Sequence, residues 1–486
     1  MYRTSRVIVT EQTSDPSPKI RRIMSIAPLG TGVNIGCHHV SLVSVRRALV
    51  ERVLLTVRNS VGSDHFPPID PEPYFWQYPS YIRQLRMYLD NVPTMTRINF
   101  VGSMRGSKRR LYEQALLSLE THPVSQKDAN ISAFQKFQKE DFTAKEDPCT
   151  RLIQPAHPRF NIEFGCYIKP LEHHTYRALD RLFGDITGSR LAVVAKGLNA
   201  IQRGHLIHDK WKRFDDPCAI MFDLHRCDQH TSLPAAQMTW RYYKSVFRDR
   251  SFSHLIDLIK SRSYHIRTPE GFIRYTRDYI KCSGDMDTGF ANFLTIGFVI
   301  FRMVSENQFP FELIYDGDDG GLIVERGEAN RVTTLLSSYF RRGGMECDVE
   351  DPIYELEKII FCQCQPVLTS RGYIMTRNPH SVLSKDSTTV KHLSTPLQYD
   401  FYRQSVSECG LACYSDVPVL GSFYAALSPP YRVQVKESVR MLLRENSGLY
   451  FLSKGMTASS SPVLDETRLS FFKAFDISPY QQVLIE

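Results

Sequence analysis

The sequence predicts an α+β protein, on three observations. Between residues 151 and 365, short β-rich runs alternate with stretches of helical period. Residues 218–222 form an uninterrupted apolar run of the kind found in a buried strand. Apolar residues on either side, Phe311, Leu313 and Ile314 before and residues 322–324 after, flank a Gly-Asp-Asp-Gly turn and predict a β-hairpin. No internal repeat or low-complexity tract interrupts this pattern.

Length and composition limit the possible size of the fold, the class of partner and the cellular compartment. A chain of 486 residues exceeds one small core, so we expect several subdomains. The net charge of +8 suits a partner that bears phosphates. The longest apolar run, residues 293–304, is too short to cross a bilayer, so we expect a buried helix and no transmembrane segment. The eleven cysteines lack paired zinc spacing and favour free thiols in a reducing compartment.

The remaining segments differ in composition. Residues 1–30 are polar and contain prolines, which predicts an arm, and residues 41–58 carry apolar side chains at helical spacing. Residues 59–80 are rich in proline and predict an irregular connection. Residues 106–150 are basic and polar, as in a surface region. Residues 366–486 become increasingly helical, notably over 431–444.

Asp318 and Asp319 are adjacent carboxylates at the predicted hairpin turn. Their mutual repulsion is relieved most naturally by a divalent cation, and two hard cations that clamp phosphate oxygens are what nucleotidyl transfer needs. One plainer interpretation is a hairpin turn with no chemistry. A calcium loop is excluded because Gly327 stands where the twelfth position requires an acidic residue.

A third carboxylate follows the buried strand of residues 218–222. Asp223 ends that run, where a side chain faces the cleft above the sheet, and Asp228 can face the same cleft from the next turn. The alternatives are a salt bridge for Asp223 and a helix N-cap for Asp228. Together with the downstream hairpin, the two positions favour a shared acidic site.

A polar segment lies between these elements. Ser283 and Gly284 predict a mobile loop, and a helix is expected from about Asp287. Thr288 and Asn292 are four residues apart and share one helix face. Asp228 and Asn292 together can hydrogen-bond the 2′-hydroxyl that marks a ribonucleotide. The plainer alternative is helix capping with a polar helix face.

Taken in order, the patterns D-x4-D, S-G-x3-T-x3-N and G-D-D resemble motifs A, B and C of viral RNA-dependent RNA polymerases. Over most of residues 35–400 the chain is similar to the tombusvirus-like replicases. The stretches that carry this resemblance are RLIQP (151–155), AKGLNA (195–200), QRG (202–204), CDQH (227–230), SGDM (283–286), YELEKIIFCQ (354–363) and LSKD (383–386).

The resemblance implies a right-hand polymerase with fingers, thumb and a palm built on an antiparallel sheet. The implied divisions are an N-terminal arm (1–30), fingers (31–215, with fingertip segments and motif F at about 145–170), palm (216–365, motifs A–E, with a fingers insertion at about 235–275) and thumb (366–486). Residues 329–342 predict a helix under the sheet, as in motif D, and residues 355–366 resemble the motif E hairpin, with an ordinary strand pair as the alternative. No general acid is assigned among residues 345–352.

The implied function is an RNA-directed RNA polymerase, the nucleotidyltransferase of a positive-strand RNA virus. The implied cofactors are two Mg²⁺ ions, with Mn²⁺ as a substitute. The implied partners are RNA template, nascent RNA, ribonucleoside triphosphates, and viral or host replication factors. The expected location is a membrane-associated replication complex in the host cytoplasm, although the long upstream membrane-targeting portion of many read-through replicases is not seen here.

The resemblance also assigns site residues. Asp223 and Asp318 are the implied principal metal ligands, and Asp319 supports the second metal. The residues implied to bind nucleotide are Asp228, Ser283, Gly284, Thr288, Asn292, Lys145, Arg151 and Arg159, the last three as motif F. The residues implied to contact RNA are Lys169, Lys196, Arg203 and Lys358. Solubilising surface charge is the alternative for Lys145, Arg151, Arg159 and Lys169.

Three positions depart from the expected pattern. Asp316 precedes the Gly-Asp-Asp where a neutral residue is usual, and we expect it to face solvent. Gly320 and Gly321 form a looser continuation than usual, and Asp287 stands where Asn is common. Two other functions stay open. A reverse transcriptase is disfavoured by the ribose-reading pair, and a non-catalytic RNA-binding replication factor is disfavoured by the intact carboxylates.

Overall fold

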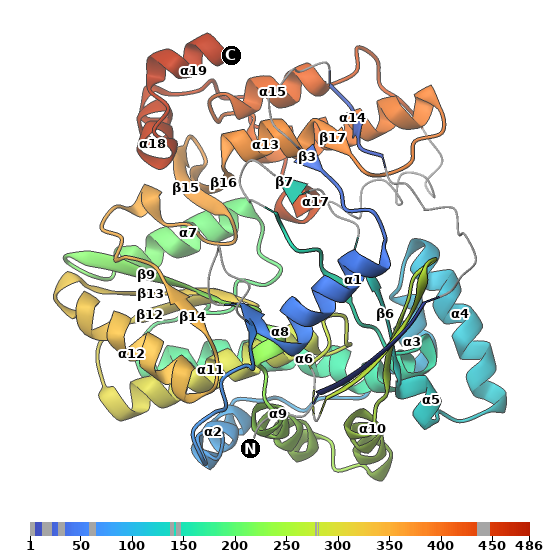
Figure 1. The fold of residues 1–486 in the computed structure, drawn as a ribbon. Coiled ribbons are helices and arrows are strands. Elements are labelled where there is room, and N and C mark those ends of the chain that lie inside the picture. The colour runs from blue at the N-terminus through green and yellow to red at the C-terminus, as the bar shows by residue number, and fades with distance from the viewer. Residues whose placement is uncertain are drawn as a thin grey trace.

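The structure is a computed structural model that describes residues 5–11, 22–27, 35–57, 65–136, 140–141, 147–277, 279, 281–434 and 448–486. Helices and several sheets share the chain, as the α+β prediction requires (Figure 1). Helices α14, α15 and α19 lie at one end of the molecule, and α2, α9 and α10 lie at the opposite end (Figure 1). Their bounds are Pro396–Tyr414, Leu420–Leu427, Pro479–Ile485, Pro79–Met87, Leu233–Val246 and Arg250–Lys260.

A four-stranded antiparallel sheet occupies the middle of the chain. Its strands lie in the order β12-β13-β9-β14, with bounds Glu312–Asp316, Asp319–Glu325, Pro217–Leu224 and Cys347–Val349. The predicted buried strand is therefore β9, and it lies between two partners. The predicted hairpin is formed by β12 and β13.

Both faces of this sheet are covered, which explains the uninterrupted apolar run in β9. Phe222 points to a core that contains α11 (Thr288–Asn307) and α12 (Ala329–Arg342), and its ring centroid lies 5.3 Å from that of Phe340. Ala219 and Met221 point the other way, to a core shared with α7 (Ala200–Trp211). The predicted helix under the sheet is α12, and it is confirmed.

Helix α11 is long and apolar enough to cross a membrane by length and composition, but 78% of its apolar window is buried inside the protein. It packs against α2, α6 (Pro158–Thr187), α9 and α12. The prediction of a buried helix over residues 293–304 is confirmed. Its first turns carry Thr288 and Asn292.

A second sheet of five strands gathers distant segments. Its order is β1-β11-β10-β6-β8, with bounds Ser5–Glu11, Gly271–Arg277, Tyr264–Arg267, Ile131–Gln135 and Leu152–Ile153. The predicted surface region contains helix α4 (Gly106–Thr121), which buries Tyr112 and Leu119 against α3 (Arg97–Gly102) and α6. Part of the predicted surface region is therefore a helix that packs on the fold through its apolar side chains. The short helix α5 spans Gln126–Ala129.

The N-terminal region joins distant parts of the fold. Helix α1 (Leu42–Leu49) begins at a Ser41 capping box and continues as a π-helix (Val50–Leu54), so the helix expected over 41–58 ends early. The remaining small pairings are β2 with β17 (Met24–Ser25, Thr388–Thr389), β3 with β7 (Ile35–Gly36, Glu140–Asp141) and β4 with β5 (Thr56–Val57, His65–Phe66). Strand β2 thus connects the first residues to the C-terminal part.

The C-terminal hairpin does not lie where the sequence analysis puts it. Strands β15 (Cys364–Thr369) and β16 (Gly372–Arg377) form the hairpin, whereas residues 355–366 hold a 3₁₀ turn (Leu356–Lys358) and a single bridge between Phe361 and Cys364. Cys362 and Gln363 have φ of +51° and +61°, so the chain reverses there after one pair. The expectation of a hairpin over 355–366 is therefore wrong.

Helix α7 lies directly on this hairpin. A Cβ on Gly204 would come within 2.1 Å of the Tyr373 carbonyl oxygen in β16, so only glycine allows the two backbones to touch. The remaining helices are α13 (Pro379–Asp386), α17 (Gly448–Leu452) and α18 (Asp465–Phe475). Residues 431–434 are not helical, and residues 435–444 of the predicted helix lie outside the described residues.

A row of carboxylates as the candidate active site

The Gly-Asp-Asp sequence forms a two-residue hairpin turn. Asp316 pairs with Asp319 across the hairpin, which leaves Gly317 and Asp318 at the tip. Gly317 has φ of +77°, the left-handed conformation that the first position of a type II′ turn requires. The turn therefore presents Asp318 at the end of the sheet, directly before β13 begins.

Strand register lines up four carboxylates across the sheet. Asp316 faces Asp319, Asp319 faces Asp223, and Asp223 faces Asp348. Directly paired residues share one face of a sheet with Cβ atoms about 5 Å apart. We call Asp316, Asp319, Asp223 and Asp348 the carboxylate row. Asp223 thus lies beside the hairpin, and Asp348 joins it from a three-residue strand that the sequence analysis did not find.

Negative charge is crowded around Asp319. Burial, followed by the neighbouring carboxylates of Asp223 and Asp318, raises the pKa of Asp319 to about 6. A bound cation would relieve this repulsion. Within the described parts of the chain, no three His, Cys, Asp or Glu side chains are arranged to enclose a metal ion. Mg²⁺ does not need such a cage, since it retains waters and binds one or two carboxylates together with substrate phosphates. The open row fits that requirement.

Asp316 does not face solvent, so that expectation is wrong. Its carboxylate forms an ion pair with Arg203 of α7, and the two side chains are only 19% and 11% exposed. The Arg203 guanidinium also donates to the Leu198 carbonyl at 3.1 Å and lies over the Phe361 ring. Arg203, which the resemblance assigns to RNA, thus neutralises the fourth carboxylate of the row.

Gly320 and Gly321 are a steric requirement rather than a loose continuation. A Cβ on Gly320 would lie 2.4 Å from the Phe222 ring, and one on Gly321 would lie 2.3 Å from the Met221 sulfur. The bare backbone lets the large side chains of β9 cross over β13. The two glycines therefore allow the close pairing that brings Asp319 beside Asp223.

Asp228 and Asn292 meet next to this row. Asp228 lies in the short helix α8 (Cys227–His230), and its carboxylate is hydrogen-bonded to the Asn292 amide. Burial raises the pKa of Asp228 to about 6, with the Lys281 ammonium opposing that rise and Asp318 adding to it. Among the described residues, the Asp228 Oδ1 atom is buried and has no hydrogen-bond partner. An unmatched buried acceptor of this kind suits a hydroxyl supplied by a ligand.

The Ser283–Gly284 loop is fixed by the strand segment that the resemblance also identified. The backbone N–H of Gln154 donates to the Ser283 carbonyl at 2.7 Å, and Gly284, with φ of +116°, packs against Ile153. The Thr288 hydroxyl donates to the Cys282 carbonyl at 2.6 Å. The Thr288 hydroxyl thus closes the loop by donating to a loop carbonyl, and the N-cap residue of α11, Asp287, forms no side-chain cap.

Two buried ion pairs under this loop were missed by the sequence analysis. The Lys281 ammonium lies 2.5 Å from the Asp287 carboxylate, which also accepts from the Tyr243 hydroxyl at 3.2 Å. Arg262 contacts both Asp285 oxygens at 2.8 Å. A neutral residue at 287 would leave Lys281 without its nearest counter-charge. The sequence offers no signal for these pairs beyond the acidic residues themselves.

The remaining predicted basic residues divide into two groups. Lys196 is exposed, with its ammonium 5.8 Å from the Phe293 ring centroid, so it lies beside the first turns of α11. Arg151 is exposed and lies in the segment that holds the loop. These two positions adjoin the carboxylate row and the loop.

The others are engaged elsewhere. Arg159 forms an ion pair with Asp128 and donates to the His122 and Pro123 carbonyls, which ties α6 to the segment between α4 and α5. Lys169 contacts Ser103, and Lys358 pairs with Asp476 at 2.8 Å. Lys145 lies outside the described residues.

A central antiparallel sheet that carries an aspartate hairpin beside an aspartate strand end is the arrangement expected of a nucleic-acid polymerase. The chain belongs to the family of viral RNA-dependent RNA polymerases, since the family profile described as "Viral RNA dependent RNA polymerase" matches residues 8–486. Enzymes of this family use divalent metal ions. Membership favours an RNA polymerase over the reverse transcriptase considered above.

Individual relatives agree with the profile. The chain is 34% identical over 472 residues to the RNA-directed RNA polymerase of Turnip crinkle virus, covering 96% of this chain and 60% of the relative. The polymerase of Carnation mottle virus is 32% identical over the same length and coverage. That of Groundnut rosette virus is 34% identical over 479 residues, which is 97% of this chain and 54% of the relative. The chain thus spans only about half to three fifths of these relatives.

Proposed function

We propose that this chain catalyses templated addition of ribonucleoside triphosphates to an RNA 3′-hydroxyl, for genome replication of a positive-strand plant RNA virus. The observation that carries the proposal is the register that aligns Asp223 with Asp319 beside the Asp318 turn. Family membership supports the same reaction. The buried, unmatched Asp228 oxygen beside Asn292 supports a ribonucleotide as substrate.

Each part of the site has a role in this proposal. Asp223 and Asp318 would hold two Mg²⁺ ions, or Mn²⁺ in their place, with Asp319 in support. Such ions activate the attacking hydroxyl and stabilise the leaving pyrophosphate. Asp228 and Asn292 would orient the ribose, and the Ser283–Gly284 loop would position the nucleotide beneath Arg151. Lys196 would neutralise phosphate beside α11.

The chain-level organisation is part of the proposal. The four-stranded sheet with α11 and α12 would be the palm, the five-stranded sheet with α3–α6 and α9–α10 the fingers, and the helices after residue 366 the thumb. Template and nascent RNA would lie across the carboxylate row. Viral or host replication factors and a membrane-associated complex in the host cytoplasm would complete the setting.

The direct test is nucleotide incorporation by the purified chain on primed and unprimed RNA, with Mg²⁺ and with EDTA. Labelled product that depends on template and Mg²⁺ is expected. An Asp318→Asn variant at the same concentration controls for a contaminating polymerase. Incorporation by the variant equal to that of the wild type would contradict the proposal, as would template-independent product.

A further inference from the structure

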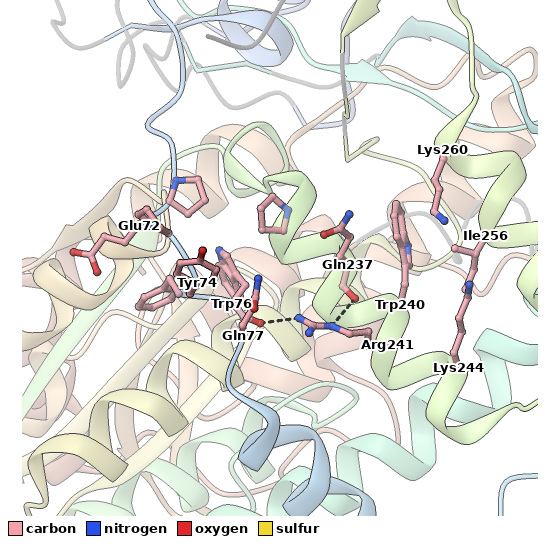
Figure 2. A pocket seen from close by; sticks show the side chains of 14 residues that line it. Glu72, Tyr74, Trp76, Gln77, Gln237, Trp240, Arg241, Lys244, Ile256 and Lys260 are labelled. Atoms are coloured by element: carbon pink, nitrogen blue, oxygen red, sulfur yellow. Dashed lines mark hydrogen bonds between the residues drawn. The ribbon is translucent and has the colours of Figure 1, made fainter. Parts of the chain in front are cut away.

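A pocket lies away from the carboxylate row, between α9, α10 and the segment of residues 71–77 (Figure 2). Its volume is about 400 Å³, in the range of small-ligand sites. Residues 237, 240, 241 and 244 line it from one face of α9, since they recur at helical spacing. From another face of the same helix, Tyr243 contacts Asp287.

The pocket carries a surplus of positive charge. Its cationic side chains are Arg241, Lys244 and Lys260, and its acidic side chain is Glu72. Glu72 is already paired with Arg342 at 2.9 Å. Lys260 pairs with Asp257, but within the described parts of the chain Arg241 and Lys244 form no ion pair. The Arg241 guanidinium instead donates to the Trp76 carbonyl at 2.9 Å (Figure 2).

Aromatic rings complete the pocket. Trp76 and Trp240 are buried in its wall, and the Lys260 ammonium lies 5.9 Å from the Trp240 ring centroid. Tyr74 stands at the rim with 76% of its surface exposed. Its backbone has φ of +63°, which is uncommon for an aromatic residue and is maintained only by a rigid surrounding.

That rigid surrounding is visible in the hydrogen bonds of the segment. The Phe75 amide donates to the Glu72 carbonyl at 3.1 Å, and the Gln77 amide donates to the Tyr74 carbonyl at 2.9 Å. The Trp76 indole donates to the Gly343 carbonyl at 3.1 Å. The segment is therefore anchored to the turn after α12. It presents the Tyr74 ring outward at the rim, where most of the ring's surface is exposed to solvent.

We propose that this pocket binds a nucleotide unit, with its base against Tyr74 and its phosphate at Lys244 and Arg241. An exposed aromatic ring beside cations is a combination that binds single-stranded nucleic acid, because the ring stacks on a base and the cations neutralise phosphates. Tyr74 is such a ring, and Arg241 and Lys244 are the cations beside it. The site would engage RNA outside the carboxylate row. It does not depend on the polymerase reaction.

The chain has a built-in reporter for this test. Two of its three tryptophans, Trp76 and Trp240, line the pocket, so in a Trp211→Phe background the indole emission reports on the pocket. We expect saturable quenching by a decauridylate in the absence of divalent ions. Tyr74→Ala and Lys244→Gln should each weaken binding about tenfold or more, because base stacking and a phosphate contact are lost. Lys244→Gln should also reduce the salt slope of log K by about 1.

Controls separate the outcomes. Arg110→Gln removes an exposed charge on α4 and should leave quenching unchanged. Tighter binding of decauridylate than of uridine monophosphate identifies an RNA strand, and equal binding identifies a free nucleotide; both support the nucleotide site. Unchanged indole emission with RNA that anisotropy shows to be bound overturns it, as does equal quenching by polyglutamate. Asp318→Asn should retain quenching while losing incorporation, which separates this site from the proposed reaction.

Discussion

Arg203 and Asp316 form an ion pair that holds helix α7 against the hairpin whose tip carries Asp318. The two residues are 113 positions apart in the chain. The pair neutralises the charge of Asp316, which lies at one end of the carboxylate row. It also fixes the end of β12 directly before the turn.

Breaking this pair from the arginine side should be costly. Arg203→Ala leaves Asp316 largely buried beside Asp319, and we expect a loss of about 1–3 kcal/mol in the free energy of unfolding together with a sharp fall in nucleotide incorporation. The double variant Arg203→Ala/Asp316→Asn should recover most of the stability, because no orphan charge remains. Chemical denaturation of both singles and the double measures the coupling. Additive effects would show that the pair contributes nothing.

The two glycines of β13 should differ in tolerance. Gly320→Ala drives a Cβ into the Phe222 ring, which is itself packed on Phe340, so a loss of about 1–3 kcal/mol is expected. Gly321→Ala meets the end of the flexible Met221 side chain and should cost less. Thermal unfolding of the two variants compares them. Recovery of Gly320→Ala by Phe222→Leu would identify the ring as the cause, and equal losses in the two singles would contradict it.

Asp319 predicts a pH dependence with a definite sign. Its carboxyl titrates at about 6 when folded and near the ordinary value of 3.8 when unfolded. Between these values the folded state keeps a proton that the unfolded state has released, so in EDTA the Asp319 contribution to stability should fall as pH rises from 4 to 6. Mg²⁺ should raise Tm above pH 6 and have little effect near pH 4, because the ion needs the carboxylate. Asp319→Asn should remove this contribution. A Mg²⁺ effect independent of pH in the wild type would contradict the assignment.

The residues of the carboxylate row should differ in how much each contributes to nucleotide incorporation. Asp223→Ala and Asp318→Ala should each lower the incorporation rate at least ~10³-fold, since both are proposed metal ligands. Asp348→Asn should retain activity and raise the Mg²⁺ concentration for half-maximal rate a few-fold, because it removes a neighbouring charge only. Rates across a Mg²⁺ titration measure both effects. A loss at Asp348 as large as that at Asp223 would make Asp348 a ligand in its own right.

Asn292 should control the choice of sugar. Asn292→Ala leaves Asp228 without its amide partner, so the preference for GTP over dGTP should fall about tenfold or more, in line with the loss of one hydrogen bond to a substrate hydroxyl. The ratio of kcat/KM for the two nucleotides measures it. The neighbouring Thr288→Ser keeps the hydroxyl that closes the loop and should retain the wild-type ratio. An unchanged ratio in Asn292→Ala would place ribose recognition elsewhere.

Local patterns predicted the parts of the site that local forces determine. The apolar run of β9, the turn of β12–β13 and the helical period of α12 each reflect burial or backbone geometry within about fifteen residues, and all three are present. Asp223 could be assigned because it ends one such run. These elements position Asp223 and Asp319 on paired strands.

Other parts depend on contacts between distant segments, which a single sequence does not reveal. Asp348 belongs to a strand of three residues, too short for a period, and becomes part of the row only through its register with β9. The environment of Asp316 is explained by its ion pair with Arg203, which is 113 residues away in the chain and which the resemblance assigns to RNA. The sequence analysis does not predict the hairpin of β15 and β16, and the reversal at Cys362 and Gln363, where φ is positive, has no sequence signature.

Helix α7 makes two contacts through consecutive residues. Arg203 binds the hairpin that carries the acidic turn, and Gly204 touches the β16 backbone of the C-terminal hairpin. Because Arg203 and Gly204 are adjacent in the chain, these two contacts fix the distance between the two hairpins. A movement of the C-terminal helices that displaces β16 must therefore also displace the acidic turn, or it must break the Arg203–Asp316 ion pair.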